Sequence, residues 1–301
     1  MNNINVILRL VRQLSLVMLQ SLKIGARKRS FLAGFYWAYV RIKCSFFPVK
    51  RNLQDLSYTR ELSLSCRQDL GMISESLSEA FVDIFLKQVE FSKQHKSLDD
   101  YFACAETGKF IRSRLVGIEG EHDLLKSFFK ETNLIAIVME YLDLNLDEIM
   151  FSAKVDSCVK LSGERHLRNG YDDALEYHRD VDSAKFVKVF VYLNDIEEGN
   201  GHHEIFLGSN RGLPVRFKIL DRFKMSDIFD SMPGIELCRV VGAKGYSWIE
   251  DTTSLHRGTV PEFGNRLMLS LSFNDAKSTR HLYNPDEYYD LWEVYNDASA
   301  I

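Results

Sequence analysis

The second half of the sequence alternates short apolar segments with glycines, and this pattern restricts the folds that the chain can adopt. From about residue 154 onward, these segments are rich in β-branched and aromatic residues. We expect strands over Val155–Leu161, Ala174–Asp180, Lys185–Leu193, Glu204–Leu207, Arg239–Val241, Tyr246–Ile249 and Leu267–Phe273. The glycines beside them are Gly199, Gly201, Gly208, Gly242, Gly245, Gly258 and Gly264. Many short strands with regular glycine turns predict a β-sandwich or jelly roll.

The preceding part of the chain has helical periodicity instead. Apolar residues at helical spacing run through Asp69–Lys87, and His122–Lys130 and Ile135–Leu144 are typical of shorter apolar elements. Helices followed by strands predict an α+β fold. We expect a domain over residues 55–301, with helical support over 55–150, a core over about 151–280 and an acidic C-terminal tail.

The composition is that of an ordinary globular protein in a reducing compartment. Of the 301 residues, 46% are hydrophobic and 27% are charged, which excludes wholesale disorder. The five cysteines are scattered and form no C-x-x-C pair: Cys44, Cys66, Cys104, Cys158 and Cys238. Neither a disulfide framework nor a structural zinc cluster is expected.

Charge is distributed unevenly along the chain. Residues 1–54 contain 10 of the 38 Lys and Arg residues and no Asp or Glu, whereas all 42 acidic residues follow. The rest of the chain therefore carries a formal charge of −14. This asymmetry predicts an anionic partner for the first segment, which could be membrane lipid, glycolipid or nucleic acid.

Read as a helix, residues 4–27 place basic side chains on one face, at Arg9, Arg12, Lys23 and Arg27. An aromatic-rich stretch, Phe31–Val49, follows. No uncharged run reaches the ~18–20 residues that span a bilayer, and the first two arginines interrupt what would be the apolar core of a secretory signal. Three interpretations stay open: packing on the protein itself or a second subunit, an anchor on an anionic membrane through residues 4–51, and a mitochondrial presequence. Nucleic acid is not expected, because no binding motif accompanies the charge.

A short motif in the strand-rich half carries candidate chemistry. In the run Tyr177-His178-Arg179-Asp180, residues two apart point to one face of a strand, so His178 and Asp180 aim into one cavity. His256 follows 76 residues after Asp180. Two histidines and one carboxylate on one face of a metal leave positions open, an arrangement that suits Fe(II).

Arg266 lies ten residues after His256, beyond a turn marked by Pro261, Gly264 and Asn265. A guanidinium at this place could bind a carboxylate with two parallel hydrogen bonds. The distal carboxylate of 2-oxoglutarate requires such a group when the other end of the molecule chelates iron.

Each of these residues also has an interpretation without any catalytic or metal-binding role. The H-x-D triplet by itself is weak, His256 could be an ordinary interior histidine, and Arg266 could form a surface ion pair. A competing H-x-E triplet, His202-His203-Glu204, directly follows Gly199-Asn200-Gly201, where a turn is expected. We therefore prefer His178 and Asp180 as ligands. The lone His95 and His122 are expected to be surface or capping residues.

From about Tyr177 to Phe273 the sequence resembles the phytanoyl-CoA dioxygenase-like Fe(II)/2-oxoglutarate oxygenases. The resemblance rests on the H-x-D run, Lys188-Val189-Phe190-Val191-Tyr192-Leu193-Asn194-Asp195, Glu198-Gly199-Asn200-Gly201, Gly208-Ser209-Asn210, Gly242-Ala243-Lys244-Gly245 and the stretch from His256 to Arg266. It implies a double-stranded β-helix (jelly-roll) core supported by N-terminal helices. It also implies that His178, Asp180 and His256 bind Fe(II), that Arg266 binds 2-oxoglutarate, that Phe190 lines the co-substrate pocket, and that O2 is consumed.

The sequence departs from the family at two positions. The family often has His where Asn210 stands, and Gly258 lacks a hydroxyl that some members offer to the 2-oxoglutarate carboxylate. Asp180 is intact, whereas related halogenases carry a small residue there, so the resemblance implies hydroxylation.

The size, the H-x-D…H triad and the basic N-terminus also resemble the membrane-associated Kdo 3-hydroxylases. This resemblance implies a cytoplasmic protein, peripheral on the inner face of the membrane, that hydroxylates the Kdo sugar of lipopolysaccharide. A soluble oxygenase of a fatty-acyl or secondary-metabolite substrate, with the N-terminal helix used to form a homo-oligomer, is the first alternative. The second is a β-sandwich that binds metal without turnover, and Arg266 argues against it.

Overall fold

The computed structural model describes residues 58–88, 99, 102, 110–114, 121–159, 176–219, 222–282 and 288–296. The basic N-terminal segment, Cys44 and Cys104 lie outside these ranges. Among the described residues, Cys66, Cys158 and Cys238 are free thiols.

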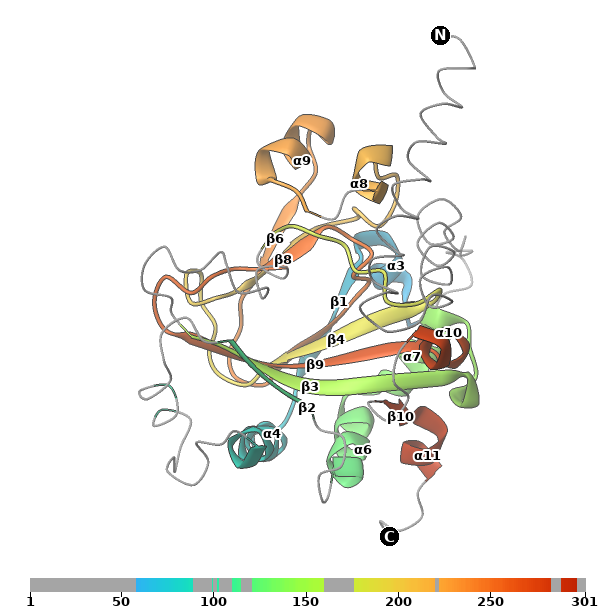
Figure 1. Ribbon diagram of the computed structural model, residues 1–301. Coiled ribbons are helices and arrows are strands. Elements are labelled where there is room, and N and C mark those ends of the chain that lie inside the picture. The colour runs from blue at the N-terminus through green and yellow to red at the C-terminus, as the bar shows by residue number, and fades with distance from the viewer. Residues whose placement is uncertain are drawn as a thin grey trace.

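The described chain forms helices and strands, with most of the strands in its second half (Figure 1). The helices are α3 (Arg60–Ser65), α4 (Glu75–Gln88), α6 (Glu121–Thr132), α7 (Leu134–Leu142), the 3-10 helix η2 (Leu146–Glu148), α8 (Val215–Ile219), α9 (Met225–Ser231), α10 (Ala276–Leu282) and α11 (Leu291–Asn296). The strands are β1 (Arg67–Met72), β2 (Phe110–Arg114), β3 (Ile149–Val159), β4 (Phe186–Tyr192), β5 (His203–Phe206), β6 (Leu237–Val240), β7 (Tyr246–Glu250), β8 (His256–Gly258), β9 (Asn265–Asp275) and β10 (Tyr289–Asp290).

The larger of two antiparallel sheets forms the centre of the molecule. Its strand order is β1-β7-β4-β9-β3-β10, and β2 also pairs with β3. Its longest pairing joins β3 and β9 over their whole lengths, from Ile149 opposite Asp275 to Val159 opposite Asn265.

The smaller sheet has the order β6-β5-β8, and the segment around His178 joins its β8 edge by an isolated bridge to His256. Figure 1 shows β6 and β8 on one side of the larger sheet and α4 and α6 on the other. From β4 onward the chain passes between the sheets: β4 is in the larger, β5 and β6 in the smaller, β7 in the larger, β8 in the smaller and β9 in the larger.

Strand β9 contributes side chains to both faces of the larger sheet. Because side chains alternate along a strand, four apolar residues join the main core with the helices α4, α6 and α7: Leu267, Leu269, Leu271 and Phe273. The intervening side chains lie on the opposite face, toward the smaller sheet: Arg266, Met268, Ser270 and Ser272. This alternation places apolar side chains against the helices, and an arginine and two serines together with Met268 on the face toward the smaller sheet.

A second cluster of buried side chains joins the two sheets. Phe190, Tyr192, Trp248 and Met268 from the larger sheet pack with Ile205 and Val240 from the smaller one. The sheets therefore face each other across a common interior, and the fold is α+β, as predicted.

The observed elements differ from the expected ones in several places, of which three bear on the site. The predicted helix over Asp69–Lys87 begins only at Glu75, because the preceding residues form β1 and pair with β7. The expected strand Ala174–Asp180 is reduced, within the residues described, to single bridges at Tyr177 and His178. Helices α8 and α9, which interrupt the strand-rich half, were not expected.

None of the helices in the described ranges is both long enough and apolar enough to cross a membrane.

Candidate metal centre

Two histidines distant in sequence are brought together by backbone hydrogen bonds. The amide of His178 donates to the carbonyl of His256, and the amide of His256 donates to the carbonyl of His178, both at 3.0 Å. Residues paired in this way place their side chains on the same face. The two imidazole centroids are accordingly 4.4 Å apart.

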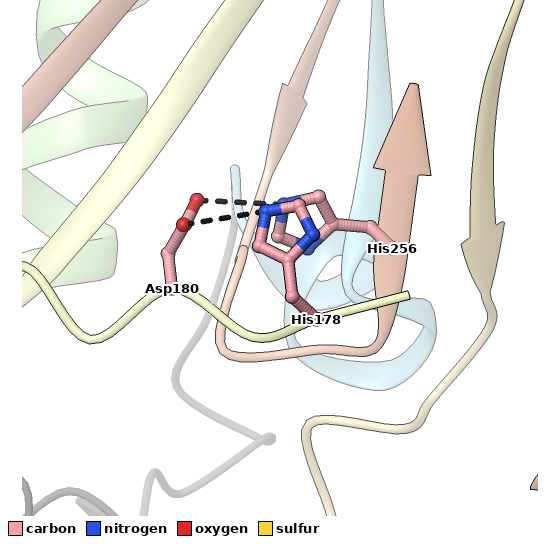
Figure 2. A group of neighbouring side chains, drawn as sticks. All are labelled: His178, Asp180 and His256. Atoms are coloured by element: carbon pink, nitrogen blue, oxygen red, sulfur yellow. Dashed lines mark ion pairs between the residues drawn. The ribbon is translucent and has the colours of Figure 1, made fainter. Parts of the chain in front are cut away.

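Asp180 completes the group from two residues beyond His178. Its amide donates to the carbonyl of Thr252 at 2.8 Å, which fixes the backbone. Its Oδ1 lies 3.7 Å from Nε2 of His178, and its Oδ2 lies 3.4 Å from Nε2 of His256. Figure 2 shows both imidazoles facing the carboxylate. In the part of the chain that the structure describes, these three residues are the only group of three or more with ligand atoms close enough, within 4.8 Å, for one metal ion.

The orientation of both imidazoles suits metal binding. Nδ1 of His178 lies 2.8 Å from the carbonyl oxygen of Glu176, and Nδ1 of His256 lies 3.1 Å from that of Ser254. A carbonyl oxygen only accepts, so each Nδ1 carries a proton, and Nε2 is the ring nitrogen of each histidine that is left to bind a metal ion.

The protonation state of His178 also suits a ligand. Burial, helped by the neighbouring His256, lowers the pKa of His178 to about 3, so this imidazole is neutral near pH 7. Two imidazoles and one carboxylate on one side of an ion form a donor set that fits Fe(II) with open positions.

Lys188 holds the carboxylate of Asp180 from inside β4. Its Nζ lies 2.6 Å from Asp180 Oδ2 and 2.8 Å from Asp182 Oδ2, and its side chain is only 13% exposed. Burial alone would lower the pKa of Lys188, but the two carboxylates raise it above its usual range. Burial likewise opposes ionisation of Asp180, yet Lys188 and the histidines hold its pKa well below the usual value.

Arg266, the predicted carboxylate-binding residue, is buried in the interior. It is 3% exposed, and Nη1 donates to the carbonyl of Gly201 at 2.5 Å. Its Nε is buried without a hydrogen-bond partner among the described residues. A buried guanidinium with an unused donor fits a carboxylate ligand.

Gly258 explains how Arg266 comes close to the metal centre. A Cβ built on Gly258 would lie 2.8 Å from Nη1 of Arg266, so the guanidinium occupies the space that a side chain would fill. Gly258 is two residues beyond His256 on β8, and both therefore face the same side. Some members of the family have a hydroxyl-bearing side chain at this position; here the guanidinium of Arg266 takes that space.

Phe190 lies in the interior between the sheets; its place in a co-substrate pocket stays a prediction. Its ring centroid is 5.2 Å from that of Trp248 and 5.3 Å from that of His203.

The competing H-x-E triplet does not form a metal group with a third ligand among the described residues. His202 Nε2 does lie 3.4 Å from Glu204 Oε1, but Glu204 also accepts from Tyr177 Oη at 2.5 Å and from Arg257 Nε at 2.7 Å. These contacts connect β5 and β8 with the His178 segment. His203 points the other way, into the interior.

The side chain of Asn210, at the position where the family often has His, forms a hydrogen bond within the protein. Its Nδ2 donates to Asp251 Oδ2 at 3.0 Å, and the hydroxyl of Tyr141 donates to the same oxygen. The neighbouring Ser209 Oγ accepts from the amide of Leu255 at 2.8 Å. This loop thereby fixes the chain just before His256.

The sequence-based search missed Lys188, His203 and Glu250. Lys188 could have been found from the sequence, because it is the single charged residue in the otherwise apolar run Phe186–Tyr192. The pairing of His203 with Glu250 joins residues 47 positions apart on different sheets, and the sequence carries no local sign of it.

The fold and site together define a class: an α+β protein of two facing antiparallel sheets, with a His/Asp/His group in its interior. No protein-family model matches the sequence, and a search of curated proteins found no match. Solved structures do match. AviO1 from Streptomyces viridochromogenes Tue57 gives a TM-score of 0.51 at 15% identity and covers 76% of this chain and 99% of its own.

Two other matches were solved with bound groups. HygX from Streptomyces hygroscopicus, with nickel and 2-oxoglutarate bound, gives a TM-score of 0.46 at 13% identity, covering 73% of this chain and 88% of its own. EctD from S. alaskensis, with bound Fe, gives 0.48 at 14% identity, covering 78% and 86%. Of these three, AviO1 alone exceeds 0.5, so the shared fold rests on it.

Proposed function

We propose that this chain is an Fe(II)- and 2-oxoglutarate-dependent dioxygenase that hydroxylates an unactivated C–H bond. The observation that carries the proposal is the His178, Asp180 and His256 group together with the buried Arg266 beside Gly258. The passage of successive strands between two facing sheets supports a double-stranded β-helix as the underlying fold.

In this proposal the triad residues are the iron ligands and leave one side of the ion open. The carbonyls of Glu176 and Ser254 hold the two imidazoles in the ligating tautomer. Lys188 occupies one oxygen of Asp180, which leaves the other oxygen to coordinate. Arg266 binds the distal carboxylate of 2-oxoglutarate, and Phe190 lines the apolar side of the co-substrate.

When bound, iron and 2-oxoglutarate supply the oxidation: O2 gives one oxygen atom to the substrate C–H bond and one to succinate, with release of CO2. The protein's own contribution is geometry and exclusion of water. Trp248 is fully buried and Phe190 is 7% exposed, so these two rings contribute apolar surface to the interior between the sheets.

For the substrate, we propose a membrane-displayed glycolipid such as the Kdo sugar of lipopolysaccharide. The support is the basic, aromatic-rich segment 4–51, which lies outside the described residues. A peripheral place on the inner face of the membrane follows from the same segment. A soluble oxygenase of a fatty-acyl or secondary-metabolite substrate is the alternative.

Anaerobic titration of Fe(II) and then 2-oxoglutarate into the purified protein tests the proposal. Bidentate chelation by the co-substrate produces a visible metal-to-ligand charge-transfer band. We expect this band in the wild type and its loss in His178→Ala and Arg266→Ala. His122→Ala and Arg280→Ala, both outside the centre, serve as matched controls and should retain it.

A folded, iron-loaded wild-type protein that gives no band would refute the proposed function. Succinate release then separates catalysis from binding: a band without any succinate in the presence of O2 would favour a protein that binds metal without turnover.

A further inference from the structure

The chain between β5 and β6 passes beside the triad. This part of the chain contains α8 and α9, and the residues just before α9 pair with the His178 segment. The amide of Phe223 donates to the carbonyl of Tyr177 at 2.9 Å, and the two residues form an isolated antiparallel bridge. The His178 segment therefore has a neighbour on each side, with β8 on one side and the residues before α9 on the other.

This register places Arg222 opposite His178. In an antiparallel pair, a step forward on one strand is a step back on the other, so the bridge between Tyr177 and Phe223 sets His178 against Arg222. Tyr177 and Phe223 belong to one buried cluster with side chains of α8 and α9. Because side chains alternate along an extended chain, Arg222 takes the other face, which is the face of His178 and the interior between the sheets.

The surroundings of Arg222 agree with this placement. The pKa of His178 is lowered mainly by burial, and the charge of Arg222 lowers it further, so the guanidinium lies near the imidazole. Arg222 is only partly buried, so a ligand that enters from solvent can reach it. Arg179, the next residue after His178, is engaged elsewhere, because its Nε donates to the carbonyl of Thr253 at 2.5 Å.

Arg222 and Arg266 lie in different directions from the triad. The Arg266 guanidinium occupies the space over Gly258, two residues along β8 from His256. Arg222 lies across the strands instead, beyond His178 and two strand steps of about 4.8 Å from β8. A co-substrate that runs from the ion along β8 to Arg266 therefore leaves Arg222 to a second ligand, the substrate.

The charge of Arg222 indicates what that ligand carries. A permanent cation beside a metal centre opposes the binding of a divalent cation, and an anionic ligand at the guanidinium offsets this repulsion. A guanidinium binds a carboxylate or a phosphate with two parallel hydrogen bonds. Arg222 also has a contact within the chain, but its five N–H donors allow it to keep that contact while it binds a ligand.

We propose that Arg222 is a substrate-binding residue that determines specificity: it binds a carboxylate or phosphate group of the substrate and thereby places a neighbouring C–H bond at the open side of the triad. This inference rests on the proposed function and deepens it, because it assigns an anionic substrate class and the residue that recognises it. The Kdo sugar proposed above carries such a carboxylate.

The test is anaerobic calorimetric titration of the full-length protein loaded with Fe(II) and 2-oxoglutarate. The probes are free Kdo, its uncharged methyl ester, and glucose 6-phosphate. We expect the wild type to bind Kdo or glucose 6-phosphate at least tenfold more tightly than the ester, and the preferred anion identifies the group as carboxylate or phosphate. Arg222→Gln should raise the Kd for that anion about tenfold or more and leave the Kd for the ester unchanged.

Two further measurements separate recognition from a structural defect. In Arg222→Gln the Kd for Fe(II), measured by competition with a chromophoric chelator, should not rise, because a repelling charge is removed. The Kd for 2-oxoglutarate, measured from the charge-transfer band, should stay within about twofold. Arg222→Lys keeps the charge and should recover part of the anion affinity, with circular dichroism confirming the fold of each variant.

Arg216→Gln is the matched control from the same part of the chain. Arg216 lies on α8, is exposed, donates to the carbonyl of Asp227 and stacks over the ring of Phe217. Its replacement should change none of these affinities.

Each outcome has a distinct meaning. A wild type that binds neither anion more tightly than the ester, or a folded Arg222→Gln that binds the preferred anion as the wild type does, would overturn the role of Arg222. An equal loss of 2-oxoglutarate affinity would also overturn it, since Arg222 would then act on the co-substrate. A wild type without a charge-transfer band would instead overturn the proposed function itself.

Discussion

At the scale of single residues, Lys188 is the feature of this site that is hardest to explain by packing. An ammonium group on the interior face of β4 is costly to bury, and among the residues that the structure describes the carboxylates of Asp180 and Asp182 offset that cost. Both carboxylates remain partly accessible, at 19% and 28% exposure. The contact therefore orients Asp180 and balances its charge more than it stabilises the fold.

Replacing Lys188 with Met should weaken Fe(II) binding roughly 10- to 100-fold, the usual effect of removing a group that holds a metal ligand in place. Fe(II) affinity measured anaerobically against a competing chelator checks this, and Lys188→Arg should restore part of it. Lys185→Met is the matched control, because Lys185 contacts Asp143 at the surface. Equal Fe(II) affinities in wild type and Lys188→Met would show that Asp180 needs no such support.

At the scale of elements, Glu204 connects β5 with β8 and the His178 segment. It is 3% exposed, accepts from Tyr177 and Arg257, and lies 3.5 Å from Nε of Arg239. Burial alone would raise its pKa, but hydrogen bonds from His202, Tyr177 and Arg257 lower the pKa to about 2. Glu204 thus ties together the strands that carry both ligand histidines.

Glu204→Gln should lower the free energy of unfolding by roughly 1.5–3 kcal/mol near pH 7, the typical value of hydrogen bonds to a charged group. Because the folded-state pKa is depressed, this stabilisation is complete above about pH 5 and is lost as the pH falls from the unfolded value near 4.3 toward about 2. Urea unfolding of both proteins at pH values from 7 down to 2 measures the difference, which should shrink over the lower half of that range. A gap that widens as the pH falls would contradict the assigned pKa shift.

The elements also show where prediction from sequence worked and where it failed. The runs that became α6, α7, β4 and β7 have a clear period, and their bounds lie within a few residues of those expected. The expected helix began at Asp69, yet residues 69–72 belong to β1, since pairing with the edge of β7 satisfies their backbone groups. That choice depends on a strand about 180 positions away, which no local pattern encodes.

At the scale of the whole molecule, the uneven charge separates the chain into a basic N-terminal segment and an acidic remainder. The second part contains every residue of the candidate centre. Membrane attachment and chemistry would then be independent properties of the two parts, which makes them separately testable.

Changing Arg9, Arg12, Lys23 and Arg27 to Glu in the full-length protein should abolish binding to vesicles rich in anionic lipid, because each basic residue near such a surface contributes about 1 kcal/mol. Sedimentation with anionic and with zwitterionic vesicles measures the effect. The charge-transfer band of the same variant is the internal control and should be unchanged. Undiminished vesicle binding would refute the membrane proposal and favour self-association of the segment.

The sequence by itself determined the α+β class, the strand-rich second half and the candidate centre, since His178, Asp180, His256 and Arg266 stand in a short pattern with few alternatives. Only the tertiary structure decided which residues surround that pattern. Lys188 reaches Asp180, and Glu250 reaches His203, because β4, β5 and β7 converge on one interior. Local periodicity shows which face a side chain takes, whereas distances across a sheet depend on register and on packing between the two sheets.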